Sequence, residues 1–226
     1  MPREASLWGS TVGKKITMAV TGTILIGFVL IHMLGNLKVY QGPEAFNGYA
    51  EGLRTFGKPF FGESQVLWIL RIGLIVALVL HLVAAYQLTV RANRARSVGY
   101  KQWDGDLVFS YASRTMRWGG VIILLFVIYH LMHFTFGNAH PDFVHGDVYR
   151  NLVVGFQSVP VSLAYIAAMI PLGLHLYHGF WSMLQTLGAN NEKYNRIRRP
   201  IAATLALAIV LANISFPVSV LTGIVR

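Results

Sequence analysis

Five apolar stretches divide this chain, and each is long enough to cross a lipid bilayer. They cover residues 15–37, 65–90, 115–136, 160–187 and 201–224. A spanning helix needs about 20 predominantly apolar residues, because each residue adds about 1.5 Å and the hydrocarbon core is about 30 Å thick. The pattern predicts an all-α membrane protein with five transmembrane helices, arranged as a single membrane domain over residues 1–226, with a short helix in each of the connections 38–64 and 137–159.

The composition agrees with a membrane protein and excludes several kinds of site. Only 12% of the residues are charged, about half the fraction of a soluble domain. Cysteine is absent, which excludes disulfides, thiolate metal sites and haem attached through thioethers. The net charge is +10, but no basic face alternates with stacking aromatics, so anionic membrane lipids are favoured as partners and nucleic acid is not.

The distribution of Lys and Arg predicts the orientation in the membrane. Thirteen of the 19 lie in the N-terminal segment, in residues 91–117 and in residues 188–199, and the other six lie in the remaining segments. Positive residues accumulate on the cytoplasmic side. We therefore expect a cytoplasmic N-terminus, an uncleaved first span and an external C-terminus, as in a multi-pass protein of the bacterial cytoplasmic membrane.

One histidine in each of the first four apolar stretches is the strongest indication of function. These residues follow one another at intervals of 49, 49 and 45 residues: His32, His81, His130 and His175. A histidine inside the hydrocarbon is costly unless both of its ring nitrogens are satisfied. The predicted topology places His32 and His130 at one depth, in the outer half, and His81 and His175 at another, nearer the inner side.

Two imidazoles from facing helices suit a haem better than a bare metal ion. Zinc and copper sites usually need three or four protein ligands, whereas a porphyrin supplies four nitrogens itself. The pairs 32/130 and 81/175 therefore predict two stacked b-type haems enclosed by the first four spans. Two alternatives remain: histidines bonded to neighbouring backbone or hydroxyl groups, and a proton relay or transporter, which the lack of Asp and Glu near mid-depth disfavours.

Four further histidines lie outside these pairs. His133 and His178 each follow a proposed ligand by three residues, one turn nearer the closest membrane surface. They are candidates for hydrogen bonds to haem propionates, or alternatively for axial ligation. His140 and His145 fall in a connection between spans, where we expect both to meet solvent.

Several stretches carry a family resemblance that covers nearly the whole chain. They are GKKITMAVTG, IHMLGNLKVYQGPEAFNGYAEGL, LVLHLVAAYQL, SRTMRWGGVIILLFVIYHLMHFT and LGLHLYHGFWSML. Together they resemble the cytochrome b subunit of succinate dehydrogenases and quinol:fumarate reductases, of the five-helix, two-haem type. The alternative is a di-haem anchor of another quinone-linked dehydrogenase, such as a hydrogenase or formate dehydrogenase, which shares histidines in its spans but not the GNL and HGFWS surroundings.

The resemblance implies axial ligation by His32, His81, His130 and His175, with His130 preferred over His133 and His175 preferred over His178. It also implies a flavoprotein subunit with FAD and an iron–sulfur subunit on the cytoplasmic face. Electrons would pass from them to the haem of the 81/175 pair, then to that of the 32/130 pair, then to a quinone, usually menaquinone. The chain itself is not expected to oxidise succinate, because it has no flavin motif and no cysteine.

Quinone is expected near the 32/130 pair. The outer ends of the first three spans offer Asn36, Glu63, Arg71 and Phe134 as candidate contacts. One departure from the family pattern is Gly173, where some fumarate reductases carry a glutamate used for proton transfer, two residues before the last ligand. A proton pathway of that kind is therefore not expected here.

Overall fold

The computed structural model describes residues 7–95 and 107–226, except for the side chains of residues 7, 107–114 and 193, and the regular structure in these ranges is helical. Seven α-helices and two short 3₁₀ helices follow one another within these ranges. In order they are η1 (Leu7–Gly9), α1 (Thr11–Asn36), η2 (Leu37–Gln41), α2 (Pro43–Thr55), α3 (Gln65–Arg94), α4 (Leu107–Phe134), α5 (Val148–Gln157), α6 (Val159–Thr186) and α7 (Glu192–Leu221).

The predicted fold class is confirmed. Within the described residues, five helices are long and apolar enough to cross a membrane, and they correspond to α1, α3, α4, α6 and α7. Many large apolar side chains on them are exposed, including Ile31, Leu125 and Leu211. Exposed apolar surface on this scale is typical of a multi-pass membrane protein, in which lipid covers it.

The fifth span begins earlier than predicted. The sequence suggests a start at residue 201, after Pro200, but α7 starts at Glu192 and continues through that proline. The side chain of Asn191 accepts a hydrogen bond of 2.9 Å from the backbone N–H of Tyr194 and so caps the helix. The segment predicted as a polar connection therefore forms the first two turns of α7.

The two short helices expected in the connections are confirmed as α2 and α5. The Asp147 carboxylate caps α5 by accepting a 3.0 Å bond from the N–H of Arg150, and it also accepts a 3.0 Å bond from the Asn47 amide of α2. These two hydrogen bonds hold the pKa of Asp147 below its usual range. The same carboxylate therefore fixes the start of α5 and joins it to α2.

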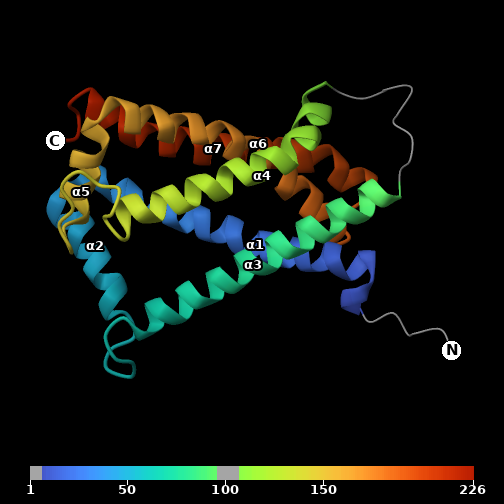
Figure 1. Cartoon of the computed structure of the whole chain (residues 1–226), viewed down its shortest axis with the longest axis horizontal. Helices are drawn as coiled ribbons and strands as arrows, with labels where there is room; N and C mark the ends of the chain where they lie inside the picture. Colours follow the sequence, from blue (N-terminus) through green and yellow to red (C-terminus); the bar gives the residue numbers. More distant parts are fainter. Residues whose placement is uncertain (1–6, 96–106) are drawn as a thin grey trace.

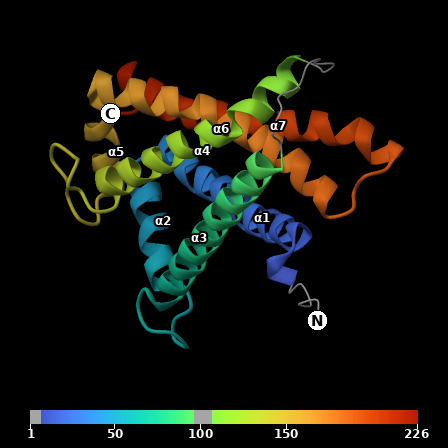
Figure 2. The same cartoon turned by 45° about the vertical axis from the view of Figure 1, so that its right-hand side comes forward.

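The five long helices pack as two neighbouring pairs with α7 against them. α1 lies beside α3, α4 lies beside α6, and α7 runs along α6 and also meets α1 (Figures 1 and 2). Figure 1 shows α2, α5 and the C-terminus at one end of the bundle and the start of α1 at the other. An apolar cluster at the α2/α5 end includes Phe46, Phe156, Tyr165 and Phe216. α5 thereby covers the ends of α4, α6 and α7.

A very close approach of α6 and α7 occurs at Gly173. A Cβ atom built there would lie 2.7 Å from Cγ2 of Val210, which is closer than real Cβ contacts allow. Small residues let membrane helices approach in this way. The position that bears a glutamate in some fumarate reductases thus faces a neighbouring helix in this protein and has no room for a longer side chain.

Candidate functional site

The four span histidines lie in two pairs that join the helix pairs across the bundle. The ring centroids of His32 in α1 and His130 in α4 are 5.9 Å apart, with an interplanar angle of 85°. Those of His81 in α3 and His175 in α6 are 6.3 Å apart, with an angle of 60°. The structure therefore brings together the same two pairs that the sequence suggests from depth alone.

These separations fit a metal ion bound between the two rings of each pair. With metal–nitrogen bonds of about 2.0 Å on opposite sides of a metal ion, the imidazole centres would be about 6 Å apart. Among the described residues, no group of three or more His, Cys, Asp or Glu side chains could hold a metal ion. A group that brings its own equatorial ligands and takes two axial histidines, such as haem, is the cofactor that this donor set fits.

Hydrogen bonding around His81 leaves one particular ring nitrogen available as a ligand. The Thr21 hydroxyl donates to the carbonyl of Thr17 at 2.7 Å, and its oxygen lies 3.1 Å from Nδ1 of His81. A hydroxyl has one proton, so here its oxygen accepts from His81, and Nδ1 carries the hydrogen. Nε2 of His81 is therefore the unprotonated nitrogen, which is the form that binds a metal.

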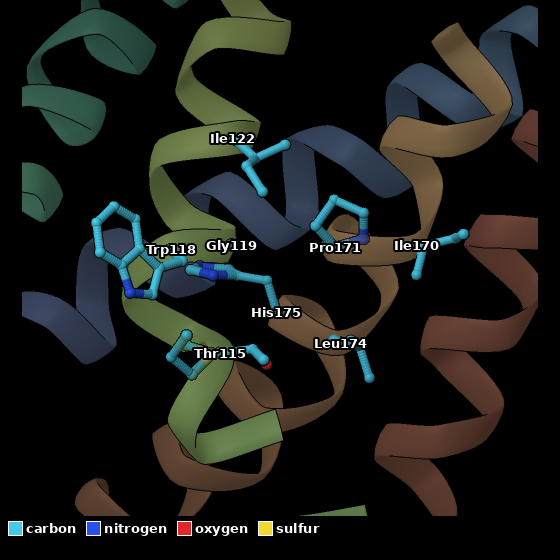
Figure 3. A pocket seen from close by; sticks show the side chains of 9 residues that line it. Thr115, Trp118, Gly119, Ile122, Ile170, Pro171, Leu174 and His175 are labelled. Carbon is cyan, nitrogen blue, oxygen red and sulfur yellow. The ribbon is translucent and has the colours of Figure 1, made fainter. Parts of the chain in front are cut away.

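The environment of His175 differs from that of its partner. Its Nδ1 is buried and has no hydrogen-bond partner among the residues that the structure describes. The ring lines a pocket of about 190 Å³ between α4 and α6, together with Trp118, Gly119 and Pro171 (Figure 3). Gly120 leaves space beside the ring, since a Cβ atom at that position would lie 3.9 Å from Cε1 of His175.

Aromatic side chains surround the 32/130 pair. Phe28, one turn before His32, stacks on its ring with centroids 5.3 Å apart. Phe126 takes the corresponding place before His130, at 6.0 Å. Nδ1 of His130 also lies 3.4 Å from the hydroxyl oxygen of Tyr165, which projects from α6.

His133 lies in a different environment from His130, although only three residues separate them. It is fully buried and stacks on Tyr129 of its own helix and on His140, with ring centroids 5.5 Å and 5.0 Å away. Its Nδ1 is 3.0 Å from the Tyr165 hydroxyl. A Cβ atom at Gly155 would lie 3.1 Å from Nε2 of His133, so α5 closes off this nitrogen.

The prediction that His140 meets solvent is wrong. His140 is buried, its Nδ1 accepts from the N–H of Asp142 at 3.0 Å, and its Nε2 lies 2.8 Å from the carbonyl oxygen of Asn151. The connection folds back over the end of α4, and this places the ring against His133. His145 is exposed, as expected for a residue in a connection.

His178 lies one turn beyond His175 on α6. Its ring is 6.2 Å from that of Trp181, which in turn stacks with the buried guanidinium of Arg198 at 5.2 Å. A cation from α7 and an imidazole from α6 thus flank the same indole. Positive charge is therefore concentrated near the cytoplasmic end predicted for these helices.

The structure does not join the candidate quinone contacts to one another. Glu63 is exposed and pairs with Lys58 at 3.4 Å. The Arg71 guanidinium lies 5.0 Å from the ring centre of Trp68 on the exposed side of α3, and Asn36 is the last residue of α1. Phe134 packs instead beside His133 and Tyr165.

The sequence did not predict that Thr21, Tyr165 and His140 contact the histidines of the spans. Thr21 is 60 residues from His81, and Tyr165 is 35 residues from His130. Threonine and tyrosine are common in apolar helices, and no local pattern marks the ones whose hydroxyl groups face a histidine. Only the packing of α1 on α3 and of α4 on α6 creates these contacts.

Comparison with known proteins finds a family match for the second half of the chain. Residues 106–214 match the family described as succinate dehydrogenase/fumarate reductase transmembrane subunit. No curated protein and no solved structure matches the chain. The matched segment contains α4, α5 and α6 and most of α7, and therefore one histidine of each pair. Over residues 106–214, this chain is therefore similar to the succinate dehydrogenase/fumarate reductase transmembrane subunits.

Proposed function

We propose that the chain is the di-haem cytochrome b anchor of a succinate:quinone oxidoreductase. The observation that carries this proposal is the presence of two histidine pairs, with ring centres 5.9 Å and 6.3 Å apart, in a membrane subunit of this family. His32 with His130, and His81 with His175, are the proposed axial ligands. The two b haems, when bound, would carry single electrons between the soluble subunits and a quinone.

The chain's own residues would bind and orient the two cofactors. Thr21 holds His81 in the tautomer whose Nε2 is free to bind. Phe28, stacked on His32, and Phe126, tilted against His130, would restrict the rotation of these two rings by packing against them. Two protein ligands on each iron leave no open coordination site, which suits electron transfer rather than oxygen or substrate binding.

His133 and His178 are less easily assigned. The full burial of His133 and the covering of its Nε2 by α5 disfavour an axial role. A contact between His133 and a haem propionate would also require α5 to move. His178 lies beside Trp181, which contacts the Arg198 guanidinium, and this positive charge suits a carboxylate. We therefore propose His178, rather than His133, as the contact to a haem propionate, and His130 and His175 as the iron ligands.

The partners proposed for this subunit are an FAD flavoprotein and an iron–sulfur protein. Basic residues in the N-terminal segment, in 91–117 and in 188–199 would form the docking surface on the cytoplasmic face. In that orientation the 81/175 pair is nearer the catalytic subunits, and the α2/α5 end lies on the external side. The membrane would be the bacterial cytoplasmic membrane.

Quinone would bind at the α2/α5 end, near the 32/130 pair. Asn36, Glu63 and Arg71 remain the polar candidates there, although Glu63 would have to leave Lys58 to take part. Menaquinone is the quinone proposed, from the resemblance to the two-haem type. The close contact of Gly173 with Val210 supports the expectation that no carboxylate replaces the glutamate of some fumarate reductases.

A haem determination on the purified complex tests the proposal. The alkaline pyridine spectrum should show protohaem at two per chain, and succinate should reduce it when the flavoprotein and iron–sulfur subunits are present. One haem per chain would contradict the di-haem assignment. No haem would contradict electron transfer by this subunit altogether.

A further inference from the structure

One ligand in each histidine pair is bonded to a hydroxyl group of the neighbouring helix. Thr21 of α1 serves His81, and Tyr165 of α6 serves His130. Both hydroxyl-bearing residues are buried, with exposed fractions of 4% and 7%. Neither bond is needed to close a helix or a turn, so the two contacts call for another explanation.

The direction of the Thr21 bond follows from the protein alone. The Thr21 hydroxyl hydrogen is directed to the Thr17 carbonyl at 2.7 Å, so the oxygen accepts from Nδ1–H of His81 at 3.1 Å. Replacing Thr21 by a residue of similar shape without a hydroxyl group would therefore remove this acceptor from Nδ1–H of His81.

The direction of the Tyr165 bond follows from counting donors. If Nε2 of His130 binds a metal, its Nδ1 carries the hydrogen and donates to the Tyr165 oxygen at 3.4 Å. The Tyr165 hydroxyl can then donate to Nδ1 of His133 at 3.0 Å. In this arrangement Nε2–H of His133 is the one group left without a partner among these three residues, which agrees with the unpaired Nε2 in the structure.

We propose that Thr21 and Tyr165 are positioning residues that set the redox potentials of the two centres independently, Thr21 for the 81/175 pair and Tyr165 for the 32/130 pair. This inference rests on the proposed function, because it requires haem at both pairs. A hydrogen bond from Nδ1–H makes the imidazole a stronger electron donor through Nε2. The stronger donor favours ferric over ferrous iron and lowers the potential.

The 81/175 pair provides a contrast within one centre. His81 has a hydroxyl partner, whereas Nδ1 of His175 is buried and has none among the described residues. The donor strength of this pair on the iron is therefore expected to depend mainly on His81. Removing a single hydroxyl group should have a measurable effect, because the opposite ligand has no comparable bond to compensate.

Redox titration of the haem absorbance in the purified complex tests the inference. The redox transition of each centre is assigned first: the transition lost in His175→Ala belongs to the 81/175 centre, and the one lost in His130→Ala belongs to the 32/130 centre. Thr21→Val should raise the midpoint potential of the 81/175 centre and leave the 32/130 centre unchanged. Tyr165→Phe should do the opposite, raising only the potential of the 32/130 centre.

Two matched variants control for changes in packing. Thr23→Val removes a hydroxyl on the same helix that bonds to Ala19 and Met183 and not to a histidine, so both potentials should stay at the wild-type values. Tyr129→Phe removes a hydroxyl from the ring that stacks on His133, with the same expectation. Thr21→Ser keeps the acceptor and should restore the wild-type potential.

The possible results separate this inference from the proposed function. Two bound haems with unshifted potentials in both Thr21→Val and Tyr165→Phe would overturn the inference and leave the proposed function intact. If Thr21→Val fails to retain haem, Thr21→Ser decides: a wild-type potential supports the inference, and a shifted one overturns it. A wild-type complex without haem would instead contradict the proposed function.

Discussion

At the scale of single residues, identical side chains have different surroundings. His130 and His133 lie one turn apart on α4, yet one faces His32 across the bundle and the other is enclosed by Tyr129, His140 and Tyr165. The difference arises because α5 packs on the end of α4 and closes the space beside Nε2 of His133. A residue type alone therefore does not identify a ligand in this protein; its neighbours do.

Substitution of these two histidines should have opposite effects. His130→Ala should halve the haem content per chain, because one centre loses an axial ligand. His133→Ala should keep both haems but lower the stability by about 2–4 kcal/mol, as expected for a cavity left by a buried ring. Pyridine haemochrome analysis and thermal unfolding in detergent measure the two effects. His145→Ala is the control, since this ring is exposed, and loss of haem in His133→Ala with retention in His130→Ala would reverse the assignment.

At the scale of helices, close contacts and caps determine how the elements meet. α6 and α7 approach closely because Gly173 has no side chain to separate them. α2 and α5 meet through Asp147 and Asn47, whose amide oxygen also accepts from the N–H of Tyr149 at 3.0 Å. The first contact joins consecutive helices and the second joins helices about 100 residues apart, and both lie outside the histidine pairs.

A methyl group at position 173 should force α6 and α7 apart. Gly173→Ala should destabilise the protein by about 1–3 kcal/mol, because the added Cβ would overlap Cγ2 of Val210 at 2.7 Å. Val210→Ala in the same chain should recover most of this loss by removing the overlapping atom. Gly27→Ala should be harmless, since no atom outside its own helix lies within 4 Å of the added carbon. Equal melting temperatures for Gly173→Ala and Gly27→Ala would refute the close contact.

The α2–α5 contact should depend on pH through Asp147. The pKa of Asp147 is lowered in the folded protein, first by the N–H of Arg150 and then by the Asn47 amide. The contribution of the Asp147 carboxylate to the free energy of unfolding is therefore fully present above the unfolded pKa of about 3.9. It is lost as the pH falls from there through the folded pKa. Asp147→Ala should lower stability by roughly 0.5–2 kcal/mol at neutral pH, and its difference from wild type should shrink below about pH 4. Glu51→Ala, which removes an exposed carboxylate paired with Arg54, should show little difference at either pH.

At the scale of the whole molecule, the two histidine pairs join two halves of the bundle, one built on α1 and α3 and the other on α4 and α6. α3 packs mainly on α1 and meets α2, whereas α4 packs on α6 and α5. Direct links between these halves are the contacts of α1 with α6 and α7 and the contact of α2 with α5. The proposed cofactors would add further links, from α1 to α4 and from α3 to α6, through the two pairs.

Removal of haem should therefore loosen α3 more than α7. In protein produced without haem synthesis, backbone amides of α3 should exchange hydrogen faster than in the loaded complex, because α3 would keep its packing on α1 and α2 but would be joined to α4 by an exposed hydrogen bond from Arg117 to Asn93 and no longer by a haem to α6. α7 should change little, since its contacts with α6 do not involve a histidine pair. The melting temperature should also fall. Uniform exchange across all five long helices would indicate that haem does not connect the two halves.

The sequence by itself determined the five long helices, the two short ones and the pairing of four histidines. Apolar length fixes which segments can span a bilayer, and alternation of direction places residues 32 and 130, and 81 and 175, at matching depths. These properties depend on composition and order along the chain. The start of α7 was misplaced because the helix continues through Pro200, its ninth residue, and proline inside membrane helices is tolerated where neighbouring groups satisfy the freed backbone.

Only the tertiary structure decided which atoms surround each histidine. The hydroxyl groups of Thr21 and Tyr165 come from other helices, 60 and 35 residues away, and His140 and Gly155 reach His133 because the connection after α4 folds back over the end of that helix. Depth is a one-dimensional quantity that the sequence encodes, whereas the rotation of a helix and the approach of its neighbour are set by side-chain packing across several helices at once. The candidate ligands were thus predictable, and the groups that orient them and fix their tautomers were not.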